Sequence, residues 1–287
     1  MKQIRFYQII TAISCLFLIS CGIEQNLKKA DKHLSLGEYY DAATQYKKVY
    51  TKTPTKERAA RGKVALKMAR CYDKINSTPK ALAAYSNAIR YKQADLNDRL
   101  AYARLLLKNG SYRQAAKEFE FLLDSMPNNV LVKNGLESAR KAPVWKKEGS
   151  RYKVKRMDVF NSRRDDYSPM FLSDDNSQLY FTSTRNEPQG SDLNGVTGTK
   201  SADIFFSEKN DKGKWSKPEA IGTGLNTDYE EGACCFTPDG KQMYLTQCAT
   251  DPTSPRLAQI VTSNRSDAAW SKPTNLEISN DTRSCLA

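Results

Sequence analysis

One stretch of this chain occurs twice, and that repeat constrains the fold more than any other feature. The copies span residues 165–183 and 228–247. In each, an acidic-aromatic start leads into a short apolar run, a polar turn (173–176, then 237–240) and an aromatic run (179–182, then 243–246). Two such runs around a polar turn predict a β-hairpin. The chain therefore carries one β unit in two copies, which indicates propeller blades or a related β array.

Further shared segments make this unit longer than a hairpin. The phrase Trp-Ser-Lys-Pro occurs at 215–218 and again at 270–273. We expect a third strand before each phrase, at 203–207 and 258–262, and a short fourth strand after it, which gives each unit the four strands of a propeller blade. A leading fourth strand is expected within 152–159. The first unit is longer because of a loop at 186–200, which is either functional or a tolerated insertion.

Two units leave a propeller incomplete. A closed ring typically has about four to eight blades, and open sheet edges pair with other strands. We therefore expect the isolated β half, residues 143–287, to be unstable or to associate with itself. Whether the propeller closes with another chain is left open by the sequence.

The first half of the chain has a helical repeat. A set of positions recurs at a constant offset of 73 residues, and part of it also recurs at an offset of 39. Such spacing of small and aromatic residues resembles the tetratricopeptide repeat (TPR), whose period is about 34 residues. Residues 21–142 are therefore expected to form an α-solenoid of about three helix pairs. The positions are Gly37, Tyr39, Ala42, Ala43, Tyr46, Val49 and Pro54, repeated as Gly110, Tyr112, Ala115, Ala116, Phe119, Leu122 and Pro127, with Ala81, Leu82, Tyr85 and Ala88 between them.

Packing explains which residue types recur. The alanines let two helices approach closely, and the aromatic residues fill the space between neighbouring pairs. Gly37, Asn76 and Gly110 suit a left-handed residue at the end of the first helix of each pair. The larger offset predicts about five extra residues near 51–57. A last helix is expected at 130–140, and Pro143 is expected to end the helices because proline disfavours helix at the residue before it.

Helical arrays of this kind bind another protein in a concave groove, or serve only as a spacer. The formal net charge of +13 favours an anionic partner. An export signal, described next, argues against nucleic acid. The basic residues of the first half form either a surface for an acidic protein or an ordinary solvated face. They are Lys28, Lys29, Lys47, Lys48, Arg58, Arg61 and Lys63.

Residues 1–20 have the pattern of an export signal, in which Lys2 and Arg5 precede an apolar stretch at 6–19. The next residues, Leu-Ile-Ser-Cys-Gly at 18–22, resemble the lipobox of bacterial lipoproteins. This resemblance implies that Cys21 becomes the N-terminus and carries a lipid anchor. Gly22 stands where an aspartate would retain a lipoprotein in the inner membrane, so an outer-membrane anchor facing the periplasm is expected. The alternative is a plain secretory signal with an incidental cysteine.

The remaining chemistry-bearing residues do not predict a catalytic, cofactor or metal site. Only one histidine, His33, is present, and we expect it to be structural. Cys71 lies in a helical pattern as a small buried residue. The acidic residues Asp165, Asp166, Asp228, Glu230 and Glu231 recur at equivalent places and are expected to cap turns rather than bind calcium. Disulfides among Cys234, Cys235, Cys248 and Cys285 are possible in an oxidising compartment, and their pairing is left open.

The β repeats themselves resemble a known family. Phe-Leu-Ser-Asp-Asp before Leu-Tyr-Phe-Thr-Ser, then Asp-Ile and Trp-Ser-Lys-Pro, look like the WD40-like propeller repeat of TolB and of outer-membrane proteins of Bacteroidetes. The order of lipobox, TPR-like helices and such repeats resembles the PorE-like lipoproteins of the OmpA family. In that group an OmpA-type peptidoglycan-binding domain follows, and this sequence stops before it, so peptidoglycan binding cannot be assigned to any residue here.

The sequence thus predicts a non-catalytic, lipid-anchored scaffold of an outer-membrane assembly, and the resemblance implies type IX secretion or gliding machinery. Its partners would be other envelope or secretion proteins and the membrane, with no cofactor. Two alternatives stay open. One is a binding protein that holds glycan, peptidoglycan or a small molecule on the propeller face, with Tyr167 and Tyr229 exposed. The other is a non-functional product of a truncated gene.

Overall fold

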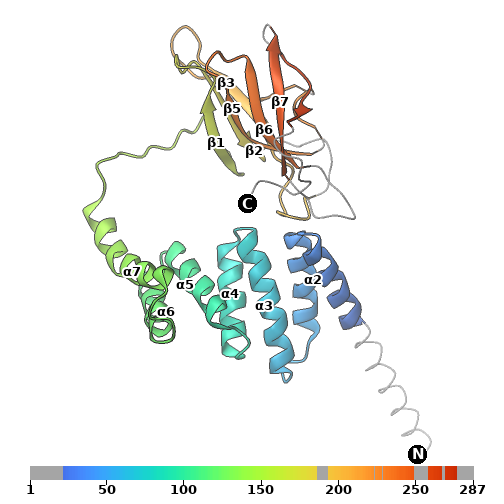
Figure 1. Cartoon of the computed structure of the whole chain (residues 1–287), viewed down its shortest axis with the longest axis vertical. Helices are drawn as coiled ribbons and strands as arrows, with labels where there is room; N and C mark the ends of the chain where they lie inside the picture. Colours follow the sequence, from blue (N-terminus) through green and yellow to red (C-terminus); the bar gives the residue numbers. More distant parts are fainter. Residues whose placement is uncertain are drawn as a thin grey trace, which may run out of the picture. The chain divides into compact units, whose positions relative to one another are not determined.

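The computed structural model describes residues 22–185, 193–222, 224–227, 229–248, 258–266 and 269–276. The chain divides into two compact units, and the boundary between them follows Lys153. The first is helical and the second is built of strands (Figure 1). The expected order, helices and then strands, is therefore confirmed. Cys21 and Cys285 lie outside the described residues, as do Asp228 and residues 1–20, the expected export signal.

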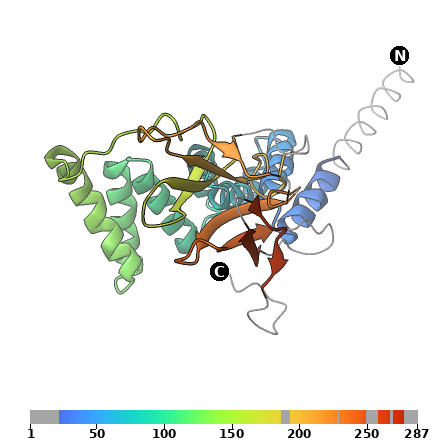
Figure 2. The ribbon, with the colours of Figure 1, turned by 90° about the horizontal axis from the view of Figure 1, so that it is seen from above.

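The helical unit is a row of antiparallel helices, each packed on the next (Figure 1), and Figure 2 shows the same row turned by 90°, with the blue helices at one end and the green helices at the other. A helix over residues 22–35 pairs with the next helix in sequence, and two further pairs and a final helix follow. The expected three helix pairs are therefore present. The elements are α2 (Tyr39–Lys52), α3 (Arg58–Lys74), α4 (Thr78–Arg90), α5 (Leu96–Lys108), α6 (Tyr112–Ser125) and α7 (Val130–Glu148).

The recurring positions form the core, as predicted. Ala42, Ala81 and Ala115 are fully buried, and so are Tyr46 and Phe119. A side chain larger than a methyl at the alanine positions would hold the helices apart, because protein interiors are packed at near-crystalline density. The turns between paired helices also follow the sequence. Gly37, Asn76 and Gly110 have φ values of 74°, 59° and 76°, in the left-handed region that ends a helix.

Two expectations about this unit are wrong. The first repeat is longer than the second, but its extra residues do not lie near 51–57, because the connections 53–57 and 91–95 have equal lengths. They lie mainly in α3, which has 17 residues where α5 has 13. The helices also do not end at Pro143. Helix α7 contains this proline and continues to Glu148, where Gly149, with φ 77°, ends it. Proline removes one hydrogen bond, but glycine supplies the left-handed conformation that turns the chain out of the helix.

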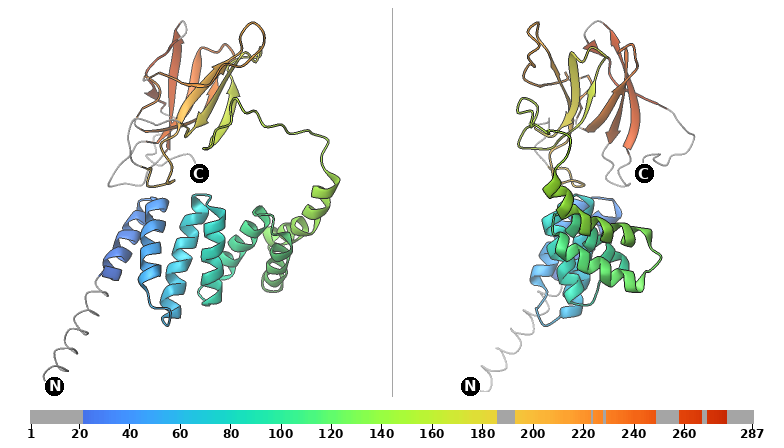
Figure 3. Two further views of the ribbon diagram at one scale, coloured as in Figure 1. Left: turned by 180° about the vertical axis from the view of Figure 1, so that it is seen from behind. Right: turned by 90° about the vertical axis from the view of Figure 1, so that its left-hand side faces the viewer.

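The β unit contains two antiparallel sheets (Figure 3). In the first sheet the strands lie in sequence order, β1-β2-β3-β4. The second has the order β5-β6-β7-β8, and β9 pairs with β7. The strands are β1 (Asp166–Phe171), β2 (Gln178–Ser183), β3 (Asp203–Glu208), β4 (Glu219–Ala220), β5 (Glu230–Phe236), β6 (Gln242–Cys248), β7 (Ala258–Ser266), β8 (Ala269–Trp270) and β9 (Thr274–Asn275). The predicted hairpins, third strands and short fourth strands are therefore all present.

The two sheets repeat each other in detail. Both hairpin turns contain a left-handed residue at the same place, Asn176 with φ 52° and Gly240 with φ 66°. Both first strands are irregular at the same place, with Ser168 and Ala233 in the left-handed region. The Trp-Ser-Lys-Pro phrases also form the same contact: in each sheet a serine hydroxyl of the third strand donates to the carbonyl of the serine in the phrase. The sequence repeat is thus a structural repeat.

The expected leading strand within 152–159 is absent. These described residues form no strand, and Tyr152 and Val154 are 84% and 94% exposed. The alternation of apolar and polar residues there resembles a strand, but a strand requires a partner that accepts its backbone hydrogen bonds. Residues 152–159 form part of the connection into the first sheet instead.

The core of the β unit lies between the two sheets. Ile204 of the first sheet is fully buried among Met243, Leu245 and Val261 of the second. A second, smaller cluster covers the other face of the first sheet and contains Phe160, Leu179, Phe181 and Phe205, with Trp215 at its edge. The first sheet is therefore apolar on both faces.

Candidate functional site

A basic groove runs between α3 and α5 of the helical unit. Its volume is about 470 Å³. Helix α3 contributes Asp73 and Lys74 at its end, and α5 contributes Ala101, Arg104, Leu105 and Lys108. Residues spaced by three or four share one face of a helix, so Ala101, Arg104 and Lys108 point to the same side of α5. The helix that lies between α3 and α5 in sequence, α4, packs against both.

The charges of this groove are mainly positive. Lys74, Arg104 and Lys108 are exposed, and Lys108 donates to the amide oxygen of Asn76, the left-handed turn residue. Asp73 is the one acidic residue among the lining residues. Burial raises the pKa of Asp73, although the charges of Arg104, Lys108 and Lys74 act in the opposite direction. The groove therefore presents three cations to solvent and favours an anionic ligand.

An ion pair between the half-exposed Arg70 of α3 and the buried Asp98 of α5 fixes the spacing of the two helices beside the groove. The guanidinium of Arg70 donates to both carboxylate oxygens of Asp98, at 2.9 and 3.1 Å. Asp98 is 5% exposed and also forms a capping box with Asp95 at the start of α5. A bidentate contact fixes orientation as well as distance. The two helices that carry the groove cations are thus held in one relative position.

A second basic pocket of about 650 Å³ lies where α3 begins and α4 ends. Its lining includes four cations and no acid: Thr55, Lys56, Arg58, Arg90, Tyr91 and Lys92. Among the basic residues singled out from the sequence, only Arg58 lines either pocket. Arg61 instead donates to the carbonyls of Tyr50 and Thr53 and stabilises the connection into α3. Sequence composition predicted the sign of the charge but not its location.

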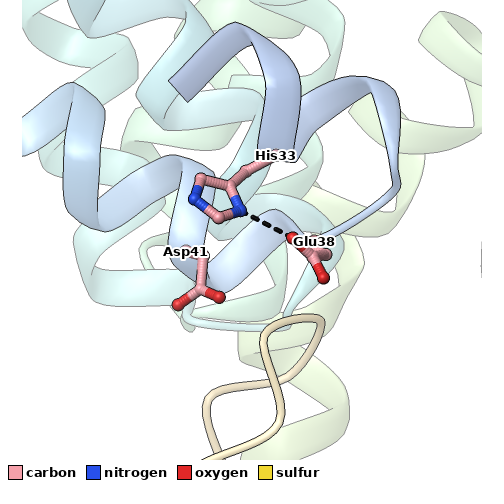
Figure 4. Close-up of side chains that lie close together, drawn as sticks. All are labelled: His33, Glu38 and Asp41. Atoms are coloured by element: carbon pink, nitrogen blue, oxygen red, sulfur yellow. Dashed lines mark hydrogen bonds and ion pairs between the residues drawn. The ribbon is translucent and has the colours of Figure 1, made fainter. Parts of the chain in front are cut away.

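His33 has neighbours that the sequence did not indicate. The ligand atoms of His33, Glu38 and Asp41 lie within 4.8 Å of one another (Figure 4). The imidazole Nδ1 of His33 is 2.6 Å from a carboxylate oxygen of Glu38. One imidazole and two carboxylates can bind a divalent ion. The hydrogen bond to Glu38 also explains the arrangement without an ion. The cluster was missed because the turn at Gly37 brings together residues that belong to two helices.

Among the described cysteines, Cys71, Cys234 and Cys235 are free thiols. Cys71 is fully buried, as expected, and burial raises the pKa of its thiol to about 12. Cys234 faces the core between the sheets, where burial likewise raises its pKa to about 12. Neighbouring Cys235 is exposed, because successive residues of a strand point to opposite faces. The pairing of Cys285 lies outside the described residues.

Two of the acidic residues of the β unit, Asp166 and Glu231, cap turns as predicted. Asp166 accepts a hydrogen bond from the backbone N–H of Ser162, and Glu231 accepts one from that of Thr227. Glu230 accepts from the backbone N–H of Ala202. Both Asp166 and Glu231 are directed to the backbone four residues earlier, so the two repeats use the same turn. Tyr167 and Tyr229 are 44% and 39% exposed.

Asp203, at the start of β3, makes the stability of the β unit depend on pH. It is 7% exposed, and burial together with Glu231 and Glu230 raises its pKa to about 7. In an unfolded chain an aspartate titrates near about pH 4. Between these values the folded state retains a proton that the unfolded state has released, so ionisation of Asp203 makes the fold less stable as the pH rises.

We therefore predict that Asp203→Asn stabilises the β unit more at pH 8 than at pH 5. The expected difference is a few kcal/mol at most, since one pKa unit corresponds to about 1.4 kcal/mol. Urea denaturation of both proteins at the two pH values measures it. An equal effect at both values would contradict the raised pKa.

Among the described residues, no helix is long and apolar enough to cross a membrane.

Comparison with family models and with curated proteins finds no match. Comparison with solved structures finds TPR domains, each of which covers about half of this chain. The C-terminal TPR-containing domain of a Plasmodium falciparum FK506-binding protein has 14% identity and a TM-score of 0.38, and the match covers 46% of this chain and 94% of that one. The P58(IPK) TPR domain has 17% identity and a TM-score of 0.37, with 47% of this chain and 37% of that chain covered. The Aspergillus fumigatus Sgt2 TPR domain has 14% identity and a TM-score of 0.35, with 47% and 87% covered.

Proposed function

We propose that this chain is a non-catalytic scaffold whose helical repeats bind an acidic segment of a partner protein. The basic groove between α3 and α5 is the observation that supports this most directly. It has three exposed cations, Lys74, Arg104 and Lys108, on two helices that the Arg70–Asp98 ion pair holds in place. A preformed surface loses little conformational freedom on binding. An extended acidic segment that lies between the two helices would contact all three cations.

Reversing the groove charges tests this function. The variant Lys74→Glu, Arg104→Glu, Lys108→Glu is compared with Lys47→Glu, Lys48→Glu, Arg113→Glu, which changes the same residue types at exposed positions of α2 and α6. Both variants have the same net charge. The probe is a fluorescein-labelled glutamate-rich peptide, and its affinity is measured by fluorescence anisotropy.

The groove variant is expected to bind this peptide about tenfold more weakly than wild type, since exposed charge pairs contribute up to about 1 kcal/mol each. The α2 and α6 variant should bind within about twofold of wild type. Equal losses in the two variants would show attraction by net charge only, and unchanged binding in the groove variant would also contradict the proposal.

The proposed setting is the periplasmic face of the outer membrane, with the chain held there by lipid on Cys21. The lipobox-like residues 18–22 support this. The two repeated antiparallel sheets, of four and five strands, support the further proposal that the β unit consists of blades of an incomplete propeller. The resemblance to PorE-like lipoproteins supports a role in type IX secretion or gliding machinery.

The anchor has a simple test. Cys21→Ala is expected to abolish incorporation of labelled palmitate and to release the protein from the membrane fraction, because stable attachment requires the lipid chains. Metabolic labelling and fractionation of cells that express each form measure both effects. Membrane retention of Cys21→Ala, with no label in the wild-type protein, would contradict lipid anchoring.

A second candidate function is glycan or peptidoglycan binding by the β unit. The exposure of Tyr167 and Tyr229 supports it, because exposed aromatic rings offer apolar faces to sugars. Cosedimentation with isolated peptidoglycan separates this function from the first: loss of cosedimentation in Tyr167→Ala, Tyr229→Ala, but not in the groove variant, would favour it.

A further inference from the structure

The two sheets of the β unit stack in a specific way. One face of the second sheet carries Phe236, Met243 and Trp270, and it packs against the first sheet. The opposing face of the first sheet carries Tyr180, with Phe206 beside it. The two sheets are repeats of each other, but each contributes a different one of its two faces to the interface between them. Repeated units that stack through two different faces can continue the series in both directions.

Tyr180 is the centre of this interface. Its ring lies 4.9 Å from that of Phe236 in an edge-to-face contact and 6.2 Å from that of Trp270. The indole N–H of Trp270 donates to the Tyr180 hydroxyl at 3.3 Å. Phe236 and Trp270 themselves lie 5.7 Å apart. Phe236 and Trp270 therefore contact both the ring and the hydroxyl of Tyr180. Since phenylalanine has no hydroxyl, this arrangement favours tyrosine over phenylalanine.

The first sheet contains the same aromatic pair. Phe171 and Trp215 occupy the places of Phe236 and Trp270, since each phenylalanine ends the first strand of its sheet and each tryptophan begins the Trp-Ser-Lys-Pro phrase. The two rings are stacked 6.3 Å apart with an angle of 22°. They line an open groove of about 510 Å³, and Phe171 is 43% exposed. We call this pair the open aromatic pair.

The second sheet contains the matching tyrosine. Tyr244 occupies the place of Tyr180, in the middle of the second strand of its sheet. Tyr180 pairs with Met170 and Phe206, and Tyr244 pairs with Cys235 and Thr262. Tyr244 is partly exposed and its neighbour Cys235 is exposed. One chain therefore carries both halves of the contact, an open aromatic pair on the first sheet and a tyrosine on the far face of the second.

We propose that the open aromatic pair binds Tyr244 of a second copy of this chain, so that copies associate head to tail through their β units. The interface would reproduce the one between the two sheets, with the Trp215 indole as donor to the Tyr244 hydroxyl. Contacts between different faces of two copies form rings or open filaments rather than closed two-fold dimers. This surface lies on the β unit and is separate from the basic groove, so the two proposals are independent.

Complementation of two variants tests the proposal in the full-length chain. Phe171→Asp places a charge in the open aromatic pair, and Tyr244→Asp places one on the opposite face. Native mass spectrometry from detergent micelles gives the oligomers of each protein alone and of their mixture. Tyr152→Asp is the matched control, because Tyr152 is 84% exposed and lies outside both faces. Thermal unfolding checks that each variant is folded, and Tyr244→Gln replaces Tyr244→Asp if the latter melts early.

Wild type and Tyr152→Asp are expected to form oligomers that grow with concentration, and each aspartate variant alone is expected to be monomeric. The mixture should form a one-to-one dimer and nothing larger, because each partner keeps one intact face. A monomeric wild type would overturn the proposal. So would oligomers of either aspartate variant, or a mixture that stays monomeric. If Phe171→Asp is monomeric but Tyr244→Asp still forms oligomers, the groove binds a residue other than Tyr244, and the proposal is wrong.

Discussion

Replacing Phe119 with alanine is expected to lower the free energy of unfolding of the helical unit by about 3–5 kcal/mol. Phe119 is fully buried between α6 and α7, in a cluster with Val132 and Leu136. It also packs directly on Gly135, where an added Cβ would lie 2.3 Å from the ring. The glycine backbone and the ring fit each other so closely that a smaller side chain leaves a cavity. Urea denaturation followed by far-ultraviolet circular dichroism measures the loss.

Phe121 on the same helix provides the control. It is 44% exposed, and its main contact is the guanidinium of Arg99, 3.8 Å from the ring centre. Phe121→Ala is expected to cost about 1 kcal/mol or less, the usual size of an exposed cation–π contact. Similar losses for the two alanine variants would contradict the assignment of Phe119 to the core.

Replacing Arg185 with alanine is expected to destabilise the β unit by about 3–5 kcal/mol, because it leaves a buried carboxylate without its charge partner. Arg185 and Asp166 are 2.5 Å apart, with side chains only 14% and 10% exposed. The guanidinium also donates to the carbonyl of Phe160 and lies over the ring of Phe181 at 4.8 Å. The fluorescence of Trp215 and Trp270 follows unfolding of this unit.

Asp166 also makes the destabilisation by Arg185→Ala depend on pH. Burial acts to raise its pKa, but the hydrogen bonds from Ser183, Arg185 and Ser162 outweigh burial and hold the pKa below its usual value. A lowered pKa contributes stability that is present at neutral pH and is lost as the pH falls through the acid range. The cost of Arg185→Ala should therefore shrink in acid. A further variant, Asp166→Asn with Arg185→Gln, replaces the ion pair with two uncharged amides, and should regain part of the loss because no buried charge is left without a partner. A cost that is independent of pH would contradict this account.

The sequence predicted the helical repeat well because the same buried positions recur at constant offsets. It placed the extra residues wrongly for a physical reason. An α-helix has about 3.6 residues per turn, so the added turn of α3 keeps Tyr72 and Ala69 on the buried face. The sequence distance between two repeats is the same whether the added residues lengthen a helix by one turn or lengthen a loop. Pro143 was given too much weight, since a helix of this length tolerates one lost hydrogen bond and ends at the next residue with a left-handed φ, Gly149.

The β repeat was predicted down to its turns, while the strand expected within 152–159 was not found. Hairpin partners are close in sequence and reveal each other. A fourth strand is recognisable only through the sheet that it joins, and no sheet in the described residues pairs with 152–159. The Trp-Ser-Lys-Pro phrase was recognised as a marker of the repeat. That Trp270 of this phrase packs with Phe236 around Tyr180 follows only from the stacking of the two sheets.

The basic groove could not be located from sequence. Lys74 lies 30 residues before Arg104, and they become neighbours because α3 and α5 are the first helices of successive pairs. The ion pair of Arg70 with Asp98 has the same origin. Composition gives the excess of positive charge, and the packing of successive helix pairs decides which cations share a surface.

Site-specific photo-crosslinking in cells tests the central claim, that the groove between α3 and α5 holds an acidic segment of a partner protein. A photoreactive amino acid replaces Ala101, which lines the groove, or Ala116, a partly buried alanine of α6 outside it. The account predicts an adduct at position 101 whose peptide, identified by mass spectrometry, is rich in aspartate and glutamate, and no such adduct at position 116. Adducts of equal yield at both positions, or a crosslinked peptide at position 101 without acidic residues, would contradict it.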